Sequence, residues 1–369
     1  MTMTLMDRPE PTLPSHWYFD AAHYQRELQT IWYRDWVCVG REDALAKPGD
    51  YFTVTIGDQN IIVTRTSDAF RAFHNTCRHR GAQICSNESG HFRNGRIICP
   101  YHTWTYSVDG ELLATPNRLD TGSFDRANYP LYDVNLETWR GFIFVNLAEN
   151  PETTVLDQLA TEADWVRNWP LEDMRSVHQV TKSVASNWKI YWENYSECYH
   201  CPRIHPALCH VMPVYKLGTS ESRDIPGWTR ADDGDAETWT PDGKSTLPAI
   251  EGLSDEEHNT IVTFASFTGM MYIAAHRDYV RTVRLLPCGP EKVELIIDWL
   301  LPSQSADTSK EALQPIIDFP TQVIVEDAQM CELNQKGLHS LRHRQGALVE
   351  QEYEIRDFHQ WLRGRLGEP

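Results

Sequence analysis

The sequence predicts an α+β protein in which a small all-β domain is followed by a larger domain with an antiparallel sheet and covering helices. Short alternating apolar runs fill residues 36–150, whereas residues 151–369 combine strand patterns with longer helical ones. A chain of 369 residues that is 41% hydrophobic and 23% charged can form two such cores. We expect residues 1–35, which are polar and rich in proline, to pack on the second domain.

The β character of residues 36–150 is indicated by five runs in which apolar and polar residues alternate. Gly, Asp, Asn and Pro separate the runs, as expected for an antiparallel sheet with short turns. The loops of such a rigid sheet can hold several ligands in a fixed arrangement. The runs are DYFTVTI, QNIIVTRT, AFRAFHN, GRIICP and GFIFVNL.

A change to helical spacing between residues 150 and 170 marks the predicted domain boundary, and a second sheet is expected beyond it. Residues 220–257 are polar, rich in turn residues and without periodicity, which indicates a lid or a disordered insertion. The predicted strands of the second sheet are residues 177–185, 261–275, 279–286 and 293–301.

Charge and cysteine content narrow the class of partner and the compartment. A net charge of -18 at pH 7 argues against binding to nucleic acid and favours small molecules and soluble proteins. Nine cysteines, an odd number, without a recognisable secretory leader predict a location in the reducing cytoplasm. No apolar run approaches the ~20 residues that span a bilayer, so we expect no membrane insertion.

Two short loops each offer one thiolate and one imidazole. They contain Cys77 and His79 in CRH, and Cys99 and His102 in CPYH. Two sulfurs for one iron and two ring nitrogens for a second iron is the ligand division of a Rieske [2Fe–2S] centre. Zinc is the alternative, although its common spacings pair Cys with Cys and His with His. The pattern therefore favours the iron–sulfur site.

A second group of candidate residues lies in SNWKIYWENYSECYHCPRIHP. Asn187 is expected to cap a helix that continues through Tyr199. Glu197 and His200 are three residues apart, so they would share one face of that helix.

His200 and His205 are five residues apart, which separates them by about 140° on an ideal helix. Pro202 is expected to break the helix just after His200, and Pro206 biases His205 away from helical backbone. The chain can then bend so that both imidazoles point inward. Two converging histidines with an open third position indicate a metal site.

A carboxylate should complete this site, because two His and one Asp or Glu are the ligands of non-haem Fe(II) oxygenases. Asp327 projects from an apolar stripe that includes Val323 and Ile324, whereas its neighbour Glu326 lies on a wetter face. A lone carboxylate on a buried stripe costs several kcal/mol unless it is neutralised, paired or bound to a cation. We therefore predict Asp327, in preference to Glu326, as the third ligand.

Both groups of residues resemble one family. CRHRG and CPYHTW resemble the Rieske domain of the ring-hydroxylating and N-demethylating oxygenases. Glu197, His200 and His205 match the family's acidic residue, a His three residues on and another His five beyond it. EDAQMCELNQKGL resembles the C-terminal metal-ligand helix, with Asp327 in the ligand position. The resemblance covers nearly the whole chain and implies a catalytic domain of the helix-grip, START-like type.

The resemblance implies a terminal oxygenase component. Electrons from a separate NAD(P)H-dependent flavin or iron–sulfur reductase would pass through the cluster to a mononuclear Fe(II), where O₂ is activated and a bound substrate is hydroxylated. Family members form ring-shaped homotrimers in which electrons cross between subunits. Glu197 resembles the acidic residue that bridges a Rieske histidine of one subunit and an iron-ligating histidine of the next, where many relatives carry Asp. No glycine-rich dinucleotide fingerprint follows any strand, which is consistent with a separate reductase.

Within the family, these motifs are most similar to the subgroup that oxidises choline, carnitine and betaines, which implies oxidation of an N-methyl or adjacent carbon. A quaternary ammonium must be recognised by aromatic faces or carboxylates. The alternative is hydroxylation or dihydroxylation of an aromatic ring, for example of an aromatic acid held by arginine. Candidates for these contacts, which core packing or a solvated strand face would equally explain, are Trp228, Trp239, Phe264, Phe267, Tyr272, Arg277, Arg281 and Arg284.

Two further classes of protein remain open at this point. One is an electron-carrying Rieske protein whose second domain only binds partners, and the other is a zinc-stabilised ligand carrier. The additional residues Glu197, His200, His205 and Asp327 argue against the first. About three irons per chain with negligible zinc would exclude the second.

Overall fold

The computed structural model describes residues 5–119, 121–220 and 234–368, and the chain divides into two compact units. One unit is Ile31–Gln158, and the other combines Met1–Thr30 with Leu159–Pro369. The first unit consists mainly of β-strands and the second of a sheet with helices, so the predicted α+β class is confirmed.

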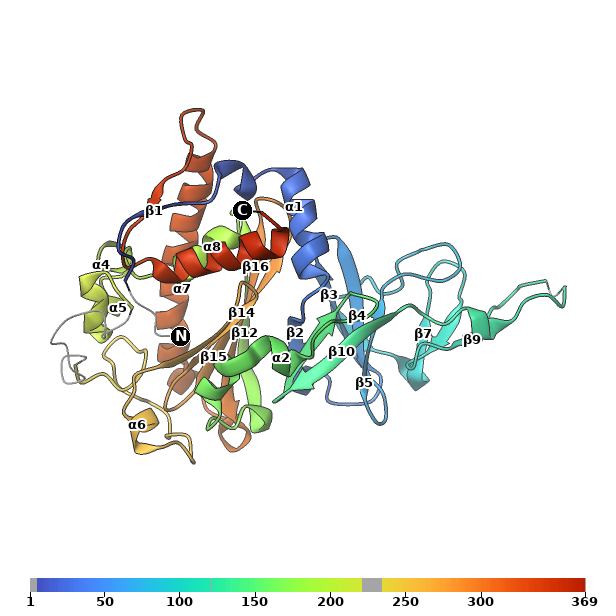
Figure 1. Cartoon of the computed structure of the whole chain (residues 1–369). Coiled ribbons are helices and arrows are strands. Elements are labelled where there is room, and N and C mark those ends of the chain that lie inside the picture. The colour runs from blue at the N-terminus through green and yellow to red at the C-terminus, as the bar shows by residue number, and fades with distance from the viewer. Residues whose placement is uncertain (1–4, 120, 221–233, 369) are drawn as a thin grey trace. The chain divides into compact units, whose positions relative to one another are not determined.

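The unit Ile31–Gln158 contains a large and a small antiparallel sheet (Figure 1). The large sheet has the strand order β2 (Val37–Arg41), β11 (Phe142–Asn146), β10 (Asp133–Trp139), β5 (Phe70–His74), β4 (Gln59–Arg65), β3 (Asp50–Ile56) and β6 (Ser89–His91). The small sheet has the order β7 (Arg96–Ile98), β8 (Thr105–Ser107) and β9 (Leu112–Ala114). The five alternating runs of the sequence form β3, β4, β5, β7 and β11, which confirms that part of the prediction.

The core of this unit joins its two sheets. Ile62 and Phe73 of the large sheet pack in one apolar cluster with Tyr106 of the small sheet. Cys77 and Cys99, from the loops that follow β5 and β7, belong to the same cluster. The two loops are therefore anchored in the core at their cysteines.

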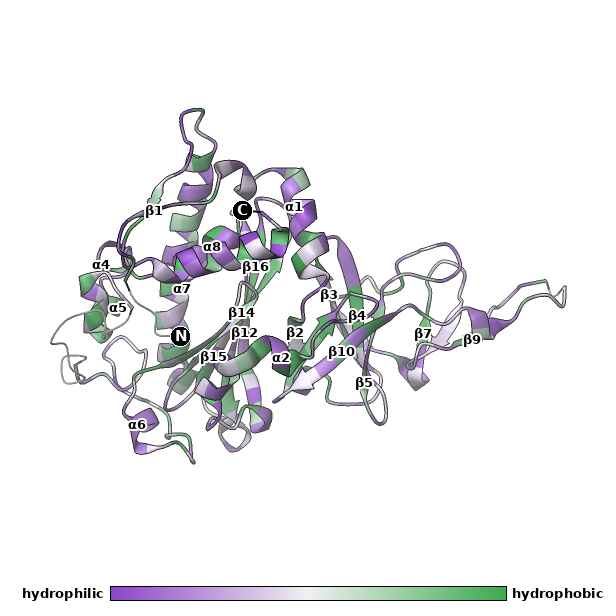
Figure 2. Ribbon diagram, in the orientation of Figure 1, coloured by the Kyte–Doolittle hydropathy of each residue, from purple (hydrophilic) through white to green (hydrophobic). Residues whose placement is uncertain are grey.

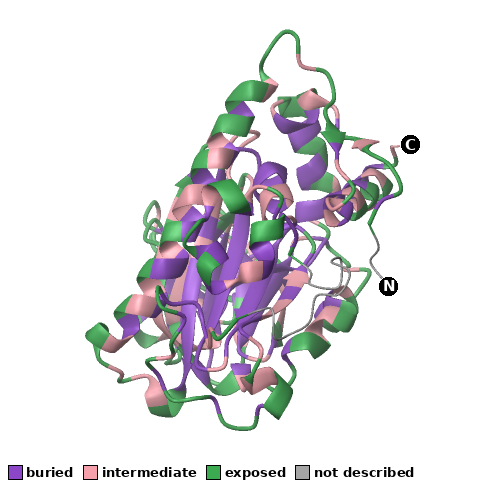
Figure 3. Cartoon of the chain, turned by 90° about the vertical axis from the view of Figure 1, so that its left-hand side faces the viewer, coloured by how far each residue is buried: buried purple, intermediate pink, exposed green. Residues whose placement is uncertain are grey.

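The second unit is built on a five-stranded sheet in which every neighbouring pair is antiparallel. Its strand order is β12 (Met174–Val184), β16 (Val293–Pro302), β15 (Val280–Pro287), β14 (Met271–Ala275) and β13 (Thr263–Phe267). Every residue of β15 is buried, and Figure 3 shows the strands of the sheet largely in the colour of buried residues. β1 (Glu10–Pro11) and β17 (Ala347–Leu348) form a separate two-stranded sheet.

The sequence predicts strand character throughout residues 261–275, but the structure forms two strands, β13 and β14, with a turn between them. Gly269 in this turn has a φ of 77°, a backbone conformation that favours glycine. A Cβ at this position would lie 2.7 Å from Cζ3 of Trp188, so the close approach of this ring also requires glycine.

Helix α7 (Lys310–Leu338) packs on the sheet. The indole N–H of Trp299 in β16 donates to the carbonyl of Ile316 in α7 at 2.7 Å. Its first turn is capped by Ser309, whose hydroxyl accepts from the backbone N–H of Ala312. Figure 2 shows both polar and apolar segments on α7 and α8, as expected for helices with one apolar face. The other helices are α1 (Ala21–Glu27), α2 (Val155–Leu159), α3 (Trp188–Tyr195), α4 (Cys201–Ile204), α5 (Leu208–Val211), α6 (Asp255–His258) and α8 (Tyr353–Leu366).

Helix α3 is fixed by a buried ion pair. The ammonium of Lys189 lies 2.5 Å from the carboxylate of Glu27 in α1, and both side chains are fully buried. Glu27 also accepts from the indole N–H of Trp188 at 2.8 Å.

Among the described residues, no helix is long and apolar enough to cross a bilayer.

Part of the predicted lid or insertion, residues 221–233 with Trp228, lies outside the described residues. Residues 234–254 form neither helix nor strand, yet Thr238, Trp239 and Thr240 are buried. Trp239 packs in an apolar cluster with Phe319 of α7. The described end of the insertion therefore packs against this unit.

Candidate metal centres

The loops that carry the two Cys–His pairs have matching backbone geometry. In each loop the N–H four residues after the cysteine donates back to the cysteine carbonyl, from Gly81 to Cys77 at 2.9 Å and from Thr103 to Cys99 at 3.0 Å. The φ angles of Gly81 and Thr103 are 74° and 57°, in the left-handed region. Threonine adopts this region at a cost, so the observed angle shows that the loop geometry is enforced by its surroundings.

The side chains of these loops separate sulfur from nitrogen donors. Cys77 and Cys99 are buried, whereas His79 is exposed. The Nδ1 atoms of His79 and His102 lie 3.2 Å apart, and Trp104 stacks on the His79 ring with 4.9 Å between centroids. The two thiols therefore lie on the core side of the site and the two imidazoles on its outer side.

This donor set fits a Rieske cluster. A neutral imidazole nitrogen is either a donor or an acceptor, and a metal ion allows two facing Nδ1 atoms to act as electron donors together. The hydroxyl of Tyr106 lies 3.3 Å from Sγ of Cys77. A hydrogen bond to a ligand sulfur is one of the interactions that set the potential of an iron–sulfur cluster.

Helix α3 leads into the second group of predicted residues. The side chain of Asn187 accepts from the N–H of Lys189 at 3.0 Å, which confirms the predicted cap. The prediction that the helix continues through Tyr199 is wrong, because α3 ends at Tyr195.

Glu197 provides the physical reason for this early end. Its carboxylate accepts from the backbone N–H groups of Tyr199 and His200, and such local side-chain bonds compete with helical ones. The chain then enters the short helix α4, in which Pro202 occupies the first turn. Proline is tolerated there, so the expectation that Pro202 breaks a helix after His200 is also wrong.

His205 follows α4 with φ −118° and ψ 59°, outside the helical region, as predicted for the residue before Pro206. A disulfide between Cys198 and Cys201, which the sequence pattern did not predict, lies within the preceding bend. The bend and the short helix together turn His200 and His205 toward each other.

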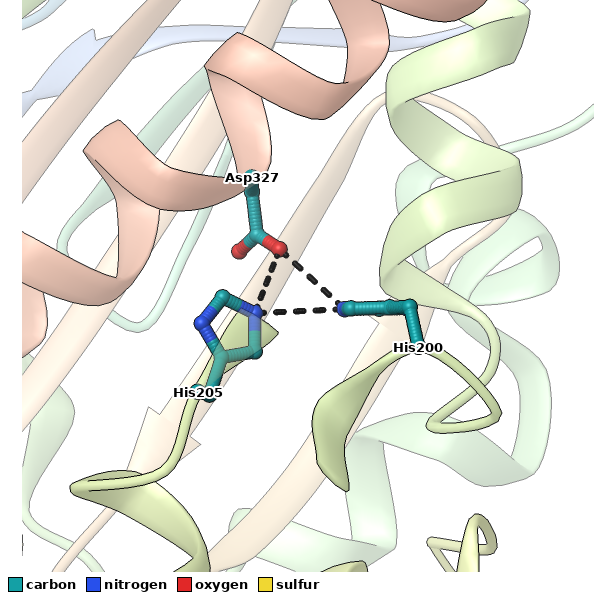
Figure 4. Close-up of side chains that lie close together, drawn as sticks. All are labelled: His200, His205 and Asp327. Atoms are coloured by element: carbon teal, nitrogen blue, oxygen red, sulfur yellow. Dashed lines mark hydrogen bonds and ion pairs between the residues drawn. The ribbon is translucent and has the colours of Figure 1, made fainter. Parts of the chain in front are cut away.

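His200, His205 and Asp327 converge, and one ligand atom of each lies within 4.8 Å of the others. Oδ1 of Asp327 lies 2.8 Å from Nε2 of His205 and 3.3 Å from Nε2 of His200, and the two Nε2 atoms are 3.2 Å apart (Figure 4). Figure 4 also shows that Asp327 projects from α7 toward both imidazoles. This two-histidine, one-carboxylate set fits a mononuclear iron.

Each histidine is held at its other ring nitrogen by a second carboxylate. Nδ1 of His200 lies 2.6 Å from Glu197, and Nδ1 of His205 lies 2.7 Å from Glu326. Such partners fix the tautomer and orientation of ligating imidazoles. The orienting role of Glu326 was missed from the sequence. Its position directly before the ligand carboxylate of Asp327 was the available signal.

Against the opposing effect of burial, the neighbouring charges raise the pKa values of His200 and His205 and lower that of Asp327. Burial lowers the pKa of His200, but its hydrogen bonds to the carboxylates of Asp327 and Glu197 outweigh this and raise the pKa to about 10. Burial raises the pKa of Asp327, but hydrogen bonds from His200 and His205 bring it down to about 2. Asn194 also donates to Oδ1 of Asp327 at 2.8 Å. The carboxylate is therefore ionised, as a metal ligand must be.

An aromatic layer lies near this triad, since Trp239 and Phe264 pack in one cluster with Val323, one turn before Asp327 in α7. Tyr195 of α3 stacks on Tyr272 of β14 with 3.8 Å between centroids, and its ring meets Phe264 of β13 at 6.2 Å. Phe264 in turn contacts Trp239 at 6.2 Å. Three of the aromatic candidates from the sequence are thus brought together. Phe267, three residues along the same strand from Phe264, lies on the opposite face of the sheet.

Two stretches of the chain match known protein families. Residues 35–125 match the Rieske [2Fe-2S] domain, and residues 171–368, more than half of the chain, match the ring hydroxylating alpha subunit (catalytic domain). The chain belongs to the ring-hydroxylating alpha-subunit family. It is the terminal subunit of a Rieske oxygenase, an oxidoreductase with a [2Fe–2S] cluster and a mononuclear iron. As an alpha subunit of this kind, it acts with a substrate, O₂ and a reductase partner.

The chain is similar to named monooxygenase proteins and to a solved structure. The glycine betaine monooxygenase oxygenase subunit of Chromohalobacter salexigens is 28% identical, with 95% of this chain and 84% of the relative covered. The chloroplastic choline monooxygenase of Spinacia oleracea is 27% identical, with 96% and 78% covered. The crystal structure of the quaternary ammonium Rieske monooxygenase CntA in complex with L-carnitine has a TM-score of 0.76 at 24% identity, and covers 97% of this chain and 96% of that one. At 24% identity, the likeness to the CntA structure shows a shared fold.

Asp327→Asn and Glu326→Gln should separate a ligand from an orienting residue. We expect Asp327→Asn to lose most of the mononuclear iron, since an amide cannot supply the negative charge of the ligand set. Glu326→Gln should weaken iron binding by about 10- to 100-fold, because His205 loses its charged partner. Iron titration of both purified variants measures this. Unchanged iron content in Asp327→Asn, with complete loss in Glu326→Gln, would reverse the two roles.

Proposed function

We propose that this alpha subunit oxidises a small quaternary ammonium compound of the betaine type, by N-demethylation or C–N cleavage. The aromatic layer near the triad is the structural observation that carries the proposal. Tyr195, Tyr272, Phe264 and Trp239 form a continuous set of ring contacts. A quaternary ammonium has no N–H to donate, and aromatic faces are the groups that attract it. The names of similar subunits, which act on glycine betaine and choline, support the same class.

In this proposal the side chains of the catalytic unit have three roles. Nε2 of His200, Nε2 of His205 and an oxygen of Asp327 would hold the iron. Glu197 and Glu326 keep the two imidazoles oriented through their Nδ1 atoms. When bound, the mononuclear iron supplies activation of O₂ and the cluster supplies single electrons. The aromatic side chains would exclude water and position the methyl groups to be oxidised.

We also propose that the alpha subunit works as a homotrimer in which Glu197 links the two metal centres of neighbouring subunits. Glu197 contacts the candidate iron ligand His200 and is 11% exposed at its side chain. In the unit Ile31–Gln158, the two loops with the Cys–His pairs form a tip that carries His79. Two large apolar side chains in or next to these loops, Ile98 and Tyr101, have exposed fractions of 52% and 60%. Large apolar side chains around a functional tip indicate a protein partner.

The partner reductase is proposed to use NAD(P)H through its own flavin or iron–sulfur groups. The absence of a dinucleotide fingerprint from this sequence supports the proposal that the reductase, not this subunit, binds NAD(P)H. The net charge of -18 would favour association with a basic surface on the reductase.

A substrate panel tests the proposal. The reduced, iron-loaded protein is incubated with a reductase, O₂ and a set of betaines, choline and aromatic acids, while formaldehyde and hydroxylated products are measured. We expect formaldehyde or C–N cleavage products with the quaternary ammonium compounds only. Ring-hydroxylated products from the aromatic acids, with no turnover of any ammonium compound, would support the alternative and overturn the proposal.

A further inference from the structure

The unit that contains the metal triad has a buried cation, Arg281, to which the proposed function gives no role. Arg281 lies on β15 and is 2% exposed. Its Nε and Nη1 atoms have no hydrogen-bond partner in the part of the chain that the structure describes. Arg284, three residues along the strand, is equally buried but donates to the carboxylate of Asp298 at 2.7 Å. Neither arginine is therefore on a solvated strand face.

Strand register places Arg281 on the face of the sheet that α7 covers. Arg281 is paired with Trp299 of β16, whose indole N–H donates to a carbonyl of α7. It is also paired with Ala274 of β14, which clusters with Val323 of α7, one turn before Asp327. Directly paired residues share a face, so the guanidinium lies in the layer that contains the metal triad.

Among the residues that the structure describes, none forms an ion pair with Arg281. Its guanidinium lies over the ring of Trp239, 4.9 Å from the centroid, and an aromatic face recovers only part of the cost of burying a cation. Both oxygens of the nearby Asp278 accept from the hydroxyls of Thr238 and Ser245. Burial, and next the charge of Arg281, hold the pKa of His276 well below its ordinary value.

Arg281 is also close to the aromatic layer. The pKa of Tyr272 is raised by burial, lowered by Arg281 and raised by Asp327, so this ring lies within electrostatic reach of both the arginine and the ligand carboxylate. Trp239 contacts Arg281 on one side and Phe264 on the other. The layer that suits a quaternary ammonium thus has a buried positive charge at one side.

We propose that Arg281 binds the carboxylate of the substrate and makes this alpha subunit selective for ammonium compounds that carry a carboxylate. This inference rests on the proposed function, because it assumes that the substrate lies in the aromatic layer. A guanidinium offers two parallel N–H groups that match the geometry of a carboxylate. Choline has an alcohol in place of that group and would leave the buried cation unpaired.

Binding of glycine betaine and choline to Arg281→Gln tests the assignment. Calorimetry on the purified, iron-loaded full chain gives both affinities without turnover. We expect the affinity for glycine betaine to fall by at least about 30-fold, as for truncation of one partner of a buried charge pair, and that for choline to change little. Arg281→Lys, which keeps the charge but loses the fork, should fall between the wild type and Arg281→Gln.

Arg284→Gln is the matched control, since it removes a buried arginine from the same strand but from the opposite face. It should lower stability and leave the ratio of the two affinities unchanged. An equal loss of both affinities in Arg281→Gln, or unchanged glycine betaine binding, would overturn the role of Arg281 while leaving the proposed function intact. Wild-type protein that binds benzoate through Arg281 but neither ammonium compound would overturn the proposed function and support the carboxylate role.

Discussion

Replacing His200 with alanine is expected to abolish substrate oxidation and leave the visible absorption of the cluster unchanged. Nε2 of His200 is 3.3 Å from Asp327 and 3.2 Å from Nε2 of His205, so its loss removes one third of the protein ligands of the mononuclear iron. None of the four Rieske residues lies in the same compact unit. Iron content should fall from about three to about two per chain.

The matched control is His210→Ala in α5, because His210 is exposed and lies outside the triad. It should retain the full iron content and activity. Loss of the cluster absorption in His200→Ala would contradict the assignment of two separate metal centres. Retained oxidation with a full iron content would contradict the ligand role of His200.

Replacing Glu197 with alanine is expected to leave the cluster intact and, with excess iron supplied, the mononuclear centre occupied, but to reduce steady-state turnover to near background. Its carboxylate lies 2.6 Å from Nδ1 of His200 and accepts from two backbone N–H groups of the bend. The variant therefore loses an orienting partner of a candidate ligand and, in the trimer that we propose, the link to the neighbouring cluster. Excess reductase should still reduce the cluster but should not restore turnover, because the electron cannot pass from the cluster to the mononuclear iron.

Comparison of single and multiple turnovers measures this effect. A chemically reduced Glu197→Ala sample should form little product in a single turnover with O₂, because one of the two electrons that the reaction needs must come from the cluster through the missing link. Glu197→Asp, which keeps the charge on a shorter side chain, should recover part of the steady-state rate. Normal steady-state coupling between electron consumption and product in Glu197→Ala would contradict the linking role.

The residues that converge in the two candidate metal centres could be predicted from the sequence because each lies in a short motif with a distinctive donor pattern. Cys77 and Cys99 are each followed by a histidine two or three residues on, and that spacing places sulfur and nitrogen donors in loops of the same shape. The apolar stripe of the helix favours Asp327 over Glu326 as the third ligand. In the structure Asp327, not Glu326, lies close to both Nε2 atoms.

The path of the chain around His200 could not be predicted from periodicity. Glu197 accepts from backbone N–H groups and so ends the helical pattern, and this use of a side chain depends on its rotamer. The environment of Arg281, whose Nε and Nη1 have no hydrogen-bond partner among the described residues, could not be predicted either. It depends on which strands are neighbours and on where Asp298 and Asp278 direct their oxygens. Long-range pairing of this kind is decided by the whole fold.

Metal analysis combined with paramagnetic resonance on the purified, reconstituted chain tests the central claim most directly. A chain that holds a Rieske cluster and a separate mononuclear iron should contain about three irons and negligible zinc. After reduction it should be coloured and show the signal of a reduced cluster ligated by two histidines. A colourless protein without that signal, or one with zinc in place of iron, would contradict the account.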